Sequence, residues 1–239
     1  MDPLLEVRVV HPSDAEAAQE GGADRLLVVA LGPGGESDLR SPEPALVSAL
    51  GRVSEVPLRV VLRLDDGDTT TGAGLVRLAG LASDYLSAGA EGVAYGFLDS
   101  DLEIDTELCA ELAGRTGMPW TFTRAFDRAL EPRRAWRAVK ALPGIDGVLT
   151  AGSVLGADQG HEALLEAAES DAVLAGLAIA AGGVRAEHVP WLVRAGVRRI
   201  HLGAAVRPAG SWGKAYTDTA LVRSWRLLLD DAVARASSA

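Results

Sequence analysis

Short apolar runs alternate with Ala-rich segments of helical character along the whole chain. The apolar runs predict strands near residues 4–10, 25–30, 57–63, 91–96, 119–123, 145–150, 173–179 and 198–203. The segments between them predict helices near residues 13–21, 42–53, 73–88, 105–115, 131–141, 157–170, 185–195 and 216–236. Eight alternating units of about 30 residues favour a single-domain (β/α)8 TIM barrel over residues 1–239, with a doubly wound open sheet as the alternative.

A glycine marks the end of four of these predicted helices. Gly22, Gly89, Gly144 and Gly196 each follow an Ala-rich segment and precede an apolar run. Glycine suits the left-handed backbone that commonly ends a helix, so these positions predict helix ends. Residues 32–44 are rich in Gly, Pro and Ser and predict a long loop after the second strand.

Composition narrows the class of protein. The net charge of −10 argues against general nucleic-acid binding, which needs a basic face. Apolar runs stay far below the roughly 18 residues of a membrane-spanning helix, so no membrane partner is expected. Cys109 is the only cysteine, which excludes an internal disulfide and fits a reducing compartment. These features predict a cytoplasmic protein.

Polar side chains follow the apolar runs where strands are expected to end. The run from Trp120 to Phe122 stops at Thr123 and Arg124, and Asp127 follows. Charged groups avoid full burial unless they are paired or needed. Because strand ends meet at the C-terminal mouth of a barrel, the predicted ligand-binding residues are those that follow strands at this end: Arg63, Arg124, Asp127, Thr150, Gly182 and Gly183.

The last two strands suggest how an anion could be held. Gly182-Gly183 and Gly203-Ala204-Ala205 have the small residues that let backbone N–H groups bind phosphate in many barrels. A tight turn needing left-handed backbone angles explains the glycines equally well. Arg63 and Arg124 could add bidentate contacts to a carboxylate or phosphate. The alternative is an internal ion pair, Arg63–Glu6 or Arg124–Asp127.

Two residues are candidates for acid–base chemistry. Glu6 lies in the middle of the first predicted strand, which makes it the carboxylate whose pKa is expected to shift. His201 lies on the last strand, and its unperturbed pKa near 6.5 suits proton transfer. A histidine on a strand can equally be a core residue whose hydrogen bonds are satisfied.

Several segments together resemble the CutC family of copper homeostasis proteins. They are LLEV at 4–7, AQEGGADR at 18–25, TFTRAFD at 121–127, LTAG at 149–152 and AGGVRAE at 181–187, with His201 on the last strand. The matching segments run in order along nearly the whole chain. The resemblance implies a (β/α)8 barrel, a role in copper homeostasis and a homo-oligomer.

The chain departs from the family pattern at several strand ends. Thr123 stands where the family usually has His, and Leu27 and Val29 stand where it usually has Glu and Cys. Cysteine is also common in the family where Arg8 or Val9 lies here. Acidic residues at 65, 66 and 68 replace a Pro-Arg-Gly-Gly-Asp pattern. These differences remove soft metal ligands.

Copper is implied by the family resemblance alone, and the sequence provides few ligands for it. Cu(I) prefers thiolate and thioether sulfur, but Cys109 lies on the apolar stripe of a predicted helix and is expected to pack inside. There is no CxxC, HxH or HExxH spacing, so no metal ligands are assigned. Asp65, Asp66 and Asp68 could hold a hard cation, although a solvated acidic loop is the alternative.

Three functions remain in competition. The first, which we favour, is a CutC-like protein that binds a small anionic or polar molecule at the barrel mouth and for which tight copper binding is doubtful. The second is a lyase or isomerase that uses Glu6 or His201 as acid or base and Arg63 and Arg124 to hold substrate. The third is a degenerate, non-catalytic barrel kept for interaction with other molecules. Whether the protein is an enzyme stays open at this point.

Overall fold

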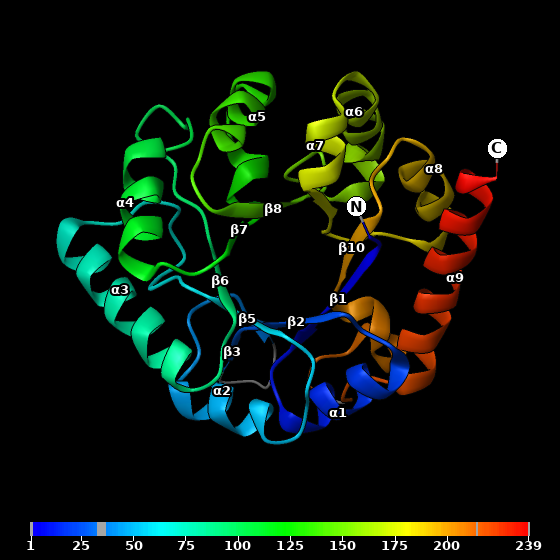
Figure 1. Ribbon diagram of the computed structural model, residues 1–239, viewed down its shortest axis with the longest axis horizontal. Helices are drawn as coiled ribbons and strands as arrows, with labels where there is room; N and C mark the ends of the chain where they lie inside the picture. The colour runs from blue at the N-terminus through cyan, green and yellow to red at the C-terminus, as the bar shows by residue number, and fades with distance from the viewer. Residues whose placement is uncertain (1, 33–36, 214, 239) are drawn as a thin grey trace.

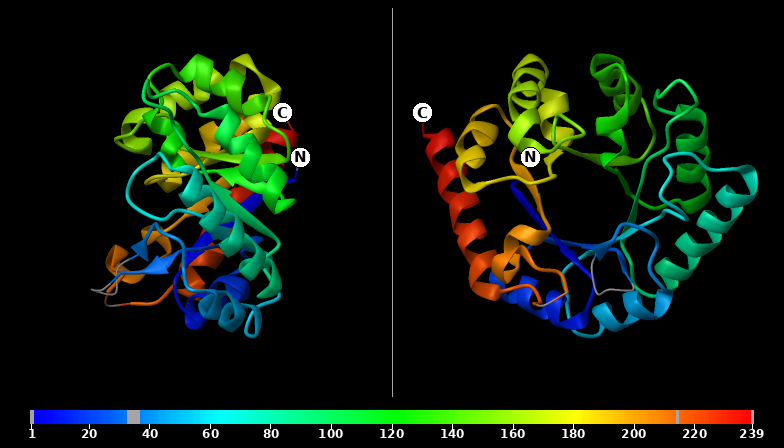
Figure 2. Two further views of the ribbon diagram at one scale, coloured as in Figure 1. Left: turned by 90° about the vertical axis from the view of Figure 1, so that its left-hand side faces the viewer. Right: turned by 180° about the vertical axis from the view of Figure 1, so that it is seen from behind.

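Eight parallel strands close into a barrel, with helices around its outside (Figures 1 and 2). The structure is a computed structural model that describes residues 2–32, 37–213 and 215–238. Around the barrel the strands follow the order β1 (Leu4–Val9), β10 (Arg199–Leu202), β9 (Ala178–Ala180), β8 (Ile145–Thr150), β7 (Trp120–Phe122), β6 (Gly92–Tyr95), β5 (Leu58–Val61) and β2 (Arg25–Val28). The (β/α)8 barrel predicted from the sequence is confirmed, and the open sheet is excluded.

The helices alternate with the strands. They are α1 (Pro12–Gly21), α2 (Pro44–Gly51), α3 (Gly72–Ser87), α4 (Thr106–Thr116), α5 (Pro132–Lys140), α6 (Ala157–Ser170), α7 (Ala172–Leu177), α8 (Val189–Arg194) and α9 (Thr219–Ser237). Short 3-10 helices follow β7 (η1, Arg124–Arg128), precede α8 (η2, Ala186–His188) and follow β10 (η3, Ala204–Val206; η4, Pro208–Gly210). The last helix, α9, lies between α8 and α1 and closes the ring (Figure 1).

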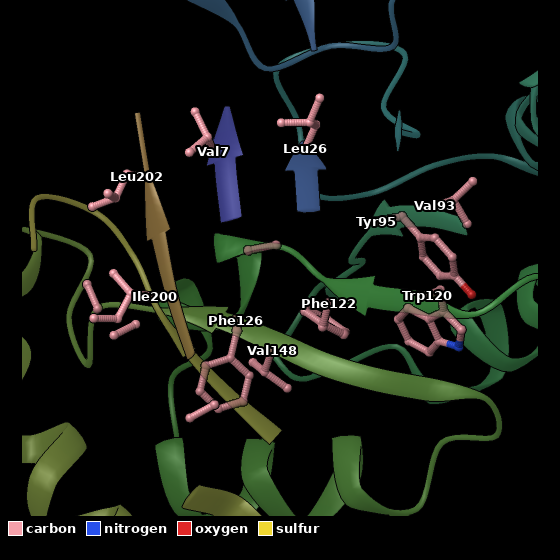
Figure 3. Close-up of a cluster of buried hydrophobic side chains, with 14 of the residues drawn as sticks. Val7, Leu26, Val93, Tyr95, Trp120, Phe122, Phe126, Val148, Ile200 and Leu202 are labelled. Atoms are coloured by element: carbon pink, nitrogen blue, oxygen red, sulfur yellow. The ribbon is translucent and has the colours of Figure 1, made fainter. Parts of the chain in front are cut away.

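The apolar core lies between the barrel and its helices. On β1, Leu5, Val7 and Val9 are fully buried and belong to this layer, and Figure 3 shows its members on several strands. Trp120 stacks on Tyr95 at 4.2 Å between ring centroids. The side chains between these outward positions point to the barrel axis, because a strand alternates its faces with period two.

The predicted helix ends are confirmed at Gly22, Gly89 and Gly196, whereas α5 ends at Lys140, before the turn that contains Gly144. Gly22, Gly89, Gly144 and Gly196 all have positive φ angles, between 70° and 99°. Glycine adopts this left-handed conformation without the steric cost that other residues have. Each glycine therefore lets the chain turn toward the next strand.

The predicted strand at residues 173–179 is wrong over most of its length. Residues Ala172 to Leu177 form helix α7, and strand β9 has only three residues. The Asp171 side chain accepts hydrogen bonds from the N–H groups of Val173 and Leu174 and so begins the helix. A short apolar run is compatible with a buried helix as well as with a buried strand. Here the Asp171 cap favours the helix.

The predicted loop at residues 32–44 is partly structured at its edges. Strand β3 (Ala30–Leu31) pairs antiparallel with β4 (Ser37–Asp38), and residues 33–36 lie outside the described residues. Figure 2 shows this small ladder projecting from the same end of the barrel as the loop after β10. The final helix begins at Thr219, after its cap Asp218, rather than near residue 216.

Gly160 of α6 tests how tightly the loop after β8 packs on its helix. A Cβ at Gly160 would lie 2.2 Å from the carbonyl oxygen of Ala151 and 2.5 Å from the nitrogen of Ser153. We expect Gly160→Ala to lower the free energy of unfolding by about 1–3 kcal/mol in urea denaturation. Gly80 lies in the middle of α3 with nothing within 4 Å of its Cβ position, so Gly80→Ala should stabilise by about 0.5–1 kcal/mol. Equal effects of the two changes would refute the close packing.

Candidate functional site

Charged and polar side chains line much of the inside of the barrel, beside a smaller apolar cluster that includes Leu27, Val61 and Ile179. Along β1 and β10 they alternate with the outward apolar residues, and β2, β5 and β8 each add one. The inward set comprises Glu6, Arg8, Arg25, Arg59, Asp146, Arg199 and His201. Glycines face several of the arginines: a Cβ at Gly92 would lie 2.6 Å from Arg59, and one at Gly147 would lie 3.1 Å from Arg199. Glycine therefore provides the space that the guanidinium groups occupy.

Glu6 is the centre of this network. Its side chain is fully buried, the Arg25 Nε donates to Oε2 at 2.5 Å, and the His201 Nδ1 lies 2.7 Å from Oε1. Burial alone would raise the pKa of Glu6, but the charge of Arg25 and the hydrogen bond from His201 outweigh it and hold the pKa far below its usual range. Glu6 is therefore ionised. The Arg63–Glu6 ion pair, which the sequence left open as an alternative, is wrong, because Arg25 on the neighbouring strand is the partner.

His201 is held as a neutral imidazole. Burial lowers its pKa, and the charges of Arg8 and Arg25 act in the same direction against the raising effect of Glu6. Because ionised Glu6 can only accept, the proton is on Nδ1. The Nε2 atom, 3.4 Å from the Arg8 Nη2, is then an acceptor for Arg8. Both ring nitrogens are engaged.

The opposite end of the network is built on Asp146. Its carboxylate accepts from the Arg59 Nη2 at 2.5 Å and from the Thr121 hydroxyl at 2.9 Å. The Arg199 Nη1 donates to the Asp146 carbonyl oxygen at 2.5 Å. The Arg25 Nη1 lies 3.7 Å from the same carboxylate and so links Asp146 to Glu6. A line of charges runs from one end of the barrel to the other.

Four of the predicted ligand-binding residues meet at the mouth. The Arg124 Nε donates to Asp127 at 2.8 Å, and its Nη2 donates to the carbonyl oxygen of Ser153 at 2.9 Å. Asp127 is almost fully buried and also accepts from the Thr150 hydroxyl at 2.5 Å. A Cβ at Gly182 would lie 2.5 Å from the Arg124 guanidinium carbon. The Arg124–Asp127 ion pair is present, and a third of the Arg124 side chain stays exposed.

The loops after β9 and β10 present backbone donors side by side. Gly182 and Gly183 both have positive φ angles, of 75° and 89°. Within the described part of the chain, the N–H groups of Gly182, Gly183, Gly203 and Ala204 donate to no acceptor. The two strands that carry these loops pair with each other, so the donors face the same region of the mouth.

Arg63 lies apart from the other predicted ligand-binding residues, and Gly183 differs from Gly182 in having no arginine packed against it. The Arg63 guanidinium donates to the carbonyl oxygens of Asp66 and Gly67 in its own loop. It also lies 3.7 Å from Asp68, which binds Arg128 at 2.7 Å. These contacts hold Arg63 at the rim, apart from the Arg124 cluster. Gly183 has no atom within 4 Å of its Cβ position and faces open space.

Sequence reasoning missed most of the inward charges. Arg8, Arg25, Arg59 and Arg199 were not selected, and neither was Asp146. A signal was present in two strands, because Glu6 and Arg8 are two residues apart, as are Arg199 and His201. That period-two spacing between apolar residues places both members of each pair on one face of a strand.

A second missed feature is the aromatic ring at the rim. The guanidinium groups of Arg8 and Arg207 lie over the same Trp212 ring, at 5.6 Å and 4.0 Å from its centroid. Arg207 also binds Asp14 at 2.6 Å. Burial lowers the pKa of Arg8 to about 10; Glu6 opposes this shift, whereas Arg124 and Arg207 add to it. Three guanidinium groups therefore act on one another at the mouth.

The single thiol of the chain does not lie at the mouth. Cys109 is fully buried on α4, between the helix and the barrel wall, and burial raises the pKa of its thiol to about 12. Among residues 2–32, 37–213 and 215–238, no three His, Cys, Asp or Glu side chains gather where they could share a metal ion. In the same ranges, no helix combines the length and apolar character needed to cross a membrane.

Glu6→Gln tests the charge at the centre of the barrel. The change leaves Arg25 buried without its carboxylate, and we expect a loss of about 3–5 kcal/mol in the free energy of unfolding at neutral pH, measured in urea. Glu111→Gln removes a carboxylate from the half-exposed pair with Arg115 and should change stability by less than about 0.5 kcal/mol.

The pH dependence of the same variant gives an independent check. Because the fold lowers the pKa of Glu6, its stabilisation is complete above the ordinary value of 4.5 and is lost as the pH falls below it. Glu6→Gln should therefore lose less stability than the natural protein on acidification. Parallel acid unfolding of both proteins would contradict the assigned charge.

The family model of the CutC family matches residues 3–206. A CutC family protein of Vibrio vulnificus is 33% identical over 219 residues, covering 87% of this chain and 84% of that protein. One from Klebsiella pneumoniae is 29% identical over 208 residues, covering 84% of this chain and 80% of the relative.

Solved structures agree on the fold. The CutC protein of Streptococcus agalactiae, named for copper homeostasis, superposes with a TM-score of 0.71 at 19% identity, covering 84% of this chain and 98% of that one. Phosphoribosylanthranilate isomerase of Pyrococcus furiosus superposes with a TM-score of 0.62 at 17% identity, covering 96% and 100%. At these identities the structures show a shared barrel alone. The family match over most of the chain goes further: this protein belongs to the CutC family.

Proposed function

We propose that this CutC family member binds a small oxyanion, a phosphate or carboxylate group, at the C-terminal mouth of its barrel. The observation that carries the proposal is a pair of neighbouring glycine loops whose N–H groups meet no acceptor in the part of the chain that the structure describes. Each loop also has a guanidinium packed against its glycine. Arg124 packs against Gly182, and a Cβ at Gly203 would lie 3.4 Å from the Arg8 guanidinium carbon.

This arrangement has the chemistry that an oxyanion needs. Backbone N–H groups donate without changing their protonation state, and two arginines supply positive charge and further donors. Asp127 accepts from the Arg124 Nε and from the Thr150 hydroxyl, so Thr150 holds the carboxylate that orients the Arg124 guanidinium. In barrels of this kind the loops after the last two strands are a recurrent place for phosphate.

The network below the mouth supports binding over acid–base catalysis. Glu6 is fully buried and His201 is 4% exposed, and each is engaged by neighbouring side chains at both polar atoms. A lyase or isomerase using either residue needs its substrate to displace these contacts. The free N–H donors in turn favour a ligand-binding mouth over a degenerate barrel.

We further propose a cytoplasmic protein that forms homo-oligomers and does not hold copper tightly. A free, buried cysteine suits a reducing compartment, and Trp191 on α8 is 59% exposed, as interface aromatics are in an isolated chain. The residues present do not fit a Cu(I) site, because the sole thiol is protonated and enclosed.

Titration with inorganic phosphate tests whether the mouth binds an oxyanion. In a 15N-labelled protein we expect the amide signals of Gly182, Gly183 and Gly203 to shift, with a dissociation constant at or below about 1 mM at low ionic strength. Arg124→Gln should weaken binding about tenfold by removing one charge-assisted contact. Arg115→Gln on the outer helix α4 removes the same charge and should leave binding unchanged. Shifts that spare these three amides would refute the proposal.

A competition titration of the reduced protein with Cu(I) and a chelator tests the statement about copper. We expect the chelator to retain the metal, because the softest ligand is the buried thiol of Cys109. Cys109→Ser should behave as the natural protein does. Stoichiometric Cu(I) capture by the protein, lost in Cys109→Ser, would contradict this expectation.

A further inference from the structure

A cavity of about 600 Å³ lies at the end of the barrel opposite the mouth. It is an open pocket bordered by the end of α6, by α7 and by the turn from α8 into β10, which lie together in Figure 1. Arg199, at the start of β10, reaches it from the barrel interior. The cavity is thus separated from the mouth by the length of the barrel.

Small side chains are the reason that the cavity exists. Ala168, Ala172 and Ala175 line it from α6 and α7, and Gly196 lines it from the turn after α8. A Cβ at Gly196 would lie 3.2 Å from the Cβ of Ala175. Helix α7 is the element that the sequence pattern assigned to a strand, and it forms one side of the cavity.

Three arginines line the cavity, and two of them have no partner in the fold. Arg194 and Arg198 form no ion pair and no side-chain hydrogen bond with any residue that the structure describes. Arg194 lies in the last turn of α8, where it favours the helix end. Arg198 lies beyond the helix, so stabilisation of the helix end does not account for its charge.

Arg199 differs from these two because it is buried. It is 8% exposed, and its Nη1 donates to the carbonyl oxygens of Asp146 and Gly176. Burial, and then the charge of Arg25, lower its pKa to about 10. A positive charge held in this way is stabilised by any anion that reaches it from the cavity.

We propose that this cavity is a second oxyanion site, which takes a small organic anion carrying phosphate or carboxylate groups on Arg194, Arg198 and Arg199. Asp2 and Glu169 also line the cavity and can accept hydrogen bonds from hydroxyl or amine groups on the same molecule. The ligand class is therefore a polyanion that also carries donors. The site depends on none of the residues proposed for the mouth.

The test is a titration of 15N-labelled protein with inorganic pyrophosphate and, separately, with citrate. We expect the amide signals of Gly176 and Gly196 to shift with at least one of the two probes, and the stronger probe identifies the phosphate or carboxylate class. The double variant Arg194→Ala/Arg198→Ala should weaken that binding about tenfold or more, by removing two charged donors. Both side chains lie at the surface of the cavity, so the variant should fold.

Two control variants test whether the shifts of Gly176 and Gly196 come from binding at this site. Arg133→Ala removes one charge from a side chain that is 94% exposed on α5 and should leave the shifts intact. Arg124→Gln, at the mouth, should also leave the Gly176 and Gly196 shifts intact. No shift of these two amides up to about 10 mM of either probe, or equal binding by the double variant and by Arg133→Ala, would overturn the proposal.

Discussion

The ion pair between Glu6 and Arg25 is the interaction on which the barrel interior depends. Inward positions of a TIM barrel are usually filled by branched apolar side chains, whereas here arginines occupy much of that space. A buried guanidinium is tolerated only with a carboxylate or several acceptors beside it. Glu6 meets this need for Arg25 and fixes His201, and Asp146 does the same for Arg59.

This interior determines what the two ends of the barrel can do. Glu6 at the centre and Asp146 toward the end opposite the mouth each bind arginines of the interior, while Arg124 at the mouth is paired with Asp127. At the mouth, Arg8 and Arg124 lie against glycine loops with free N–H groups. At the other end, Arg199 borders a cavity. Both ends are suited to anions although the whole chain carries a net charge of −10, so the local distribution of charge matters more than the total.

The barrel could be predicted from the sequence because each strand, helix and helix end is indicated by residues that are close together in the chain. Helix ends at Gly22 and Gly196 follow from glycine chemistry, and the strand and helix units repeat along the chain. Arg124, Asp127 and Thr150 were also predicted together, since each follows a strand and strand ends converge. These inferences need no knowledge of which strands are neighbours.

The interior network could not be predicted in the same way. Glu6 and His201 are 195 residues apart and meet only because β1 pairs with β10 when the barrel closes. The choice of Arg25 over Arg63 as the partner of Glu6 follows from the register of β1 on β2, where Glu6 lies beside Arg25. Apolar neighbours such as Val7 and Ile200 made these strands resemble uniformly buried ones, which hid the charged face.

The anomalous difference map of a crystal soaked in tungstate, a heavy-atom analogue of phosphate, tests most directly whether the mouth binds an oxyanion. We expect a peak between the Gly182–Gly183 and Gly203–Ala204 loops, within hydrogen-bonding distance of the Arg124 guanidinium. A map with no peak at the mouth, from crystals in which that end is open to solvent, would contradict the assignment of the mouth as an oxyanion site.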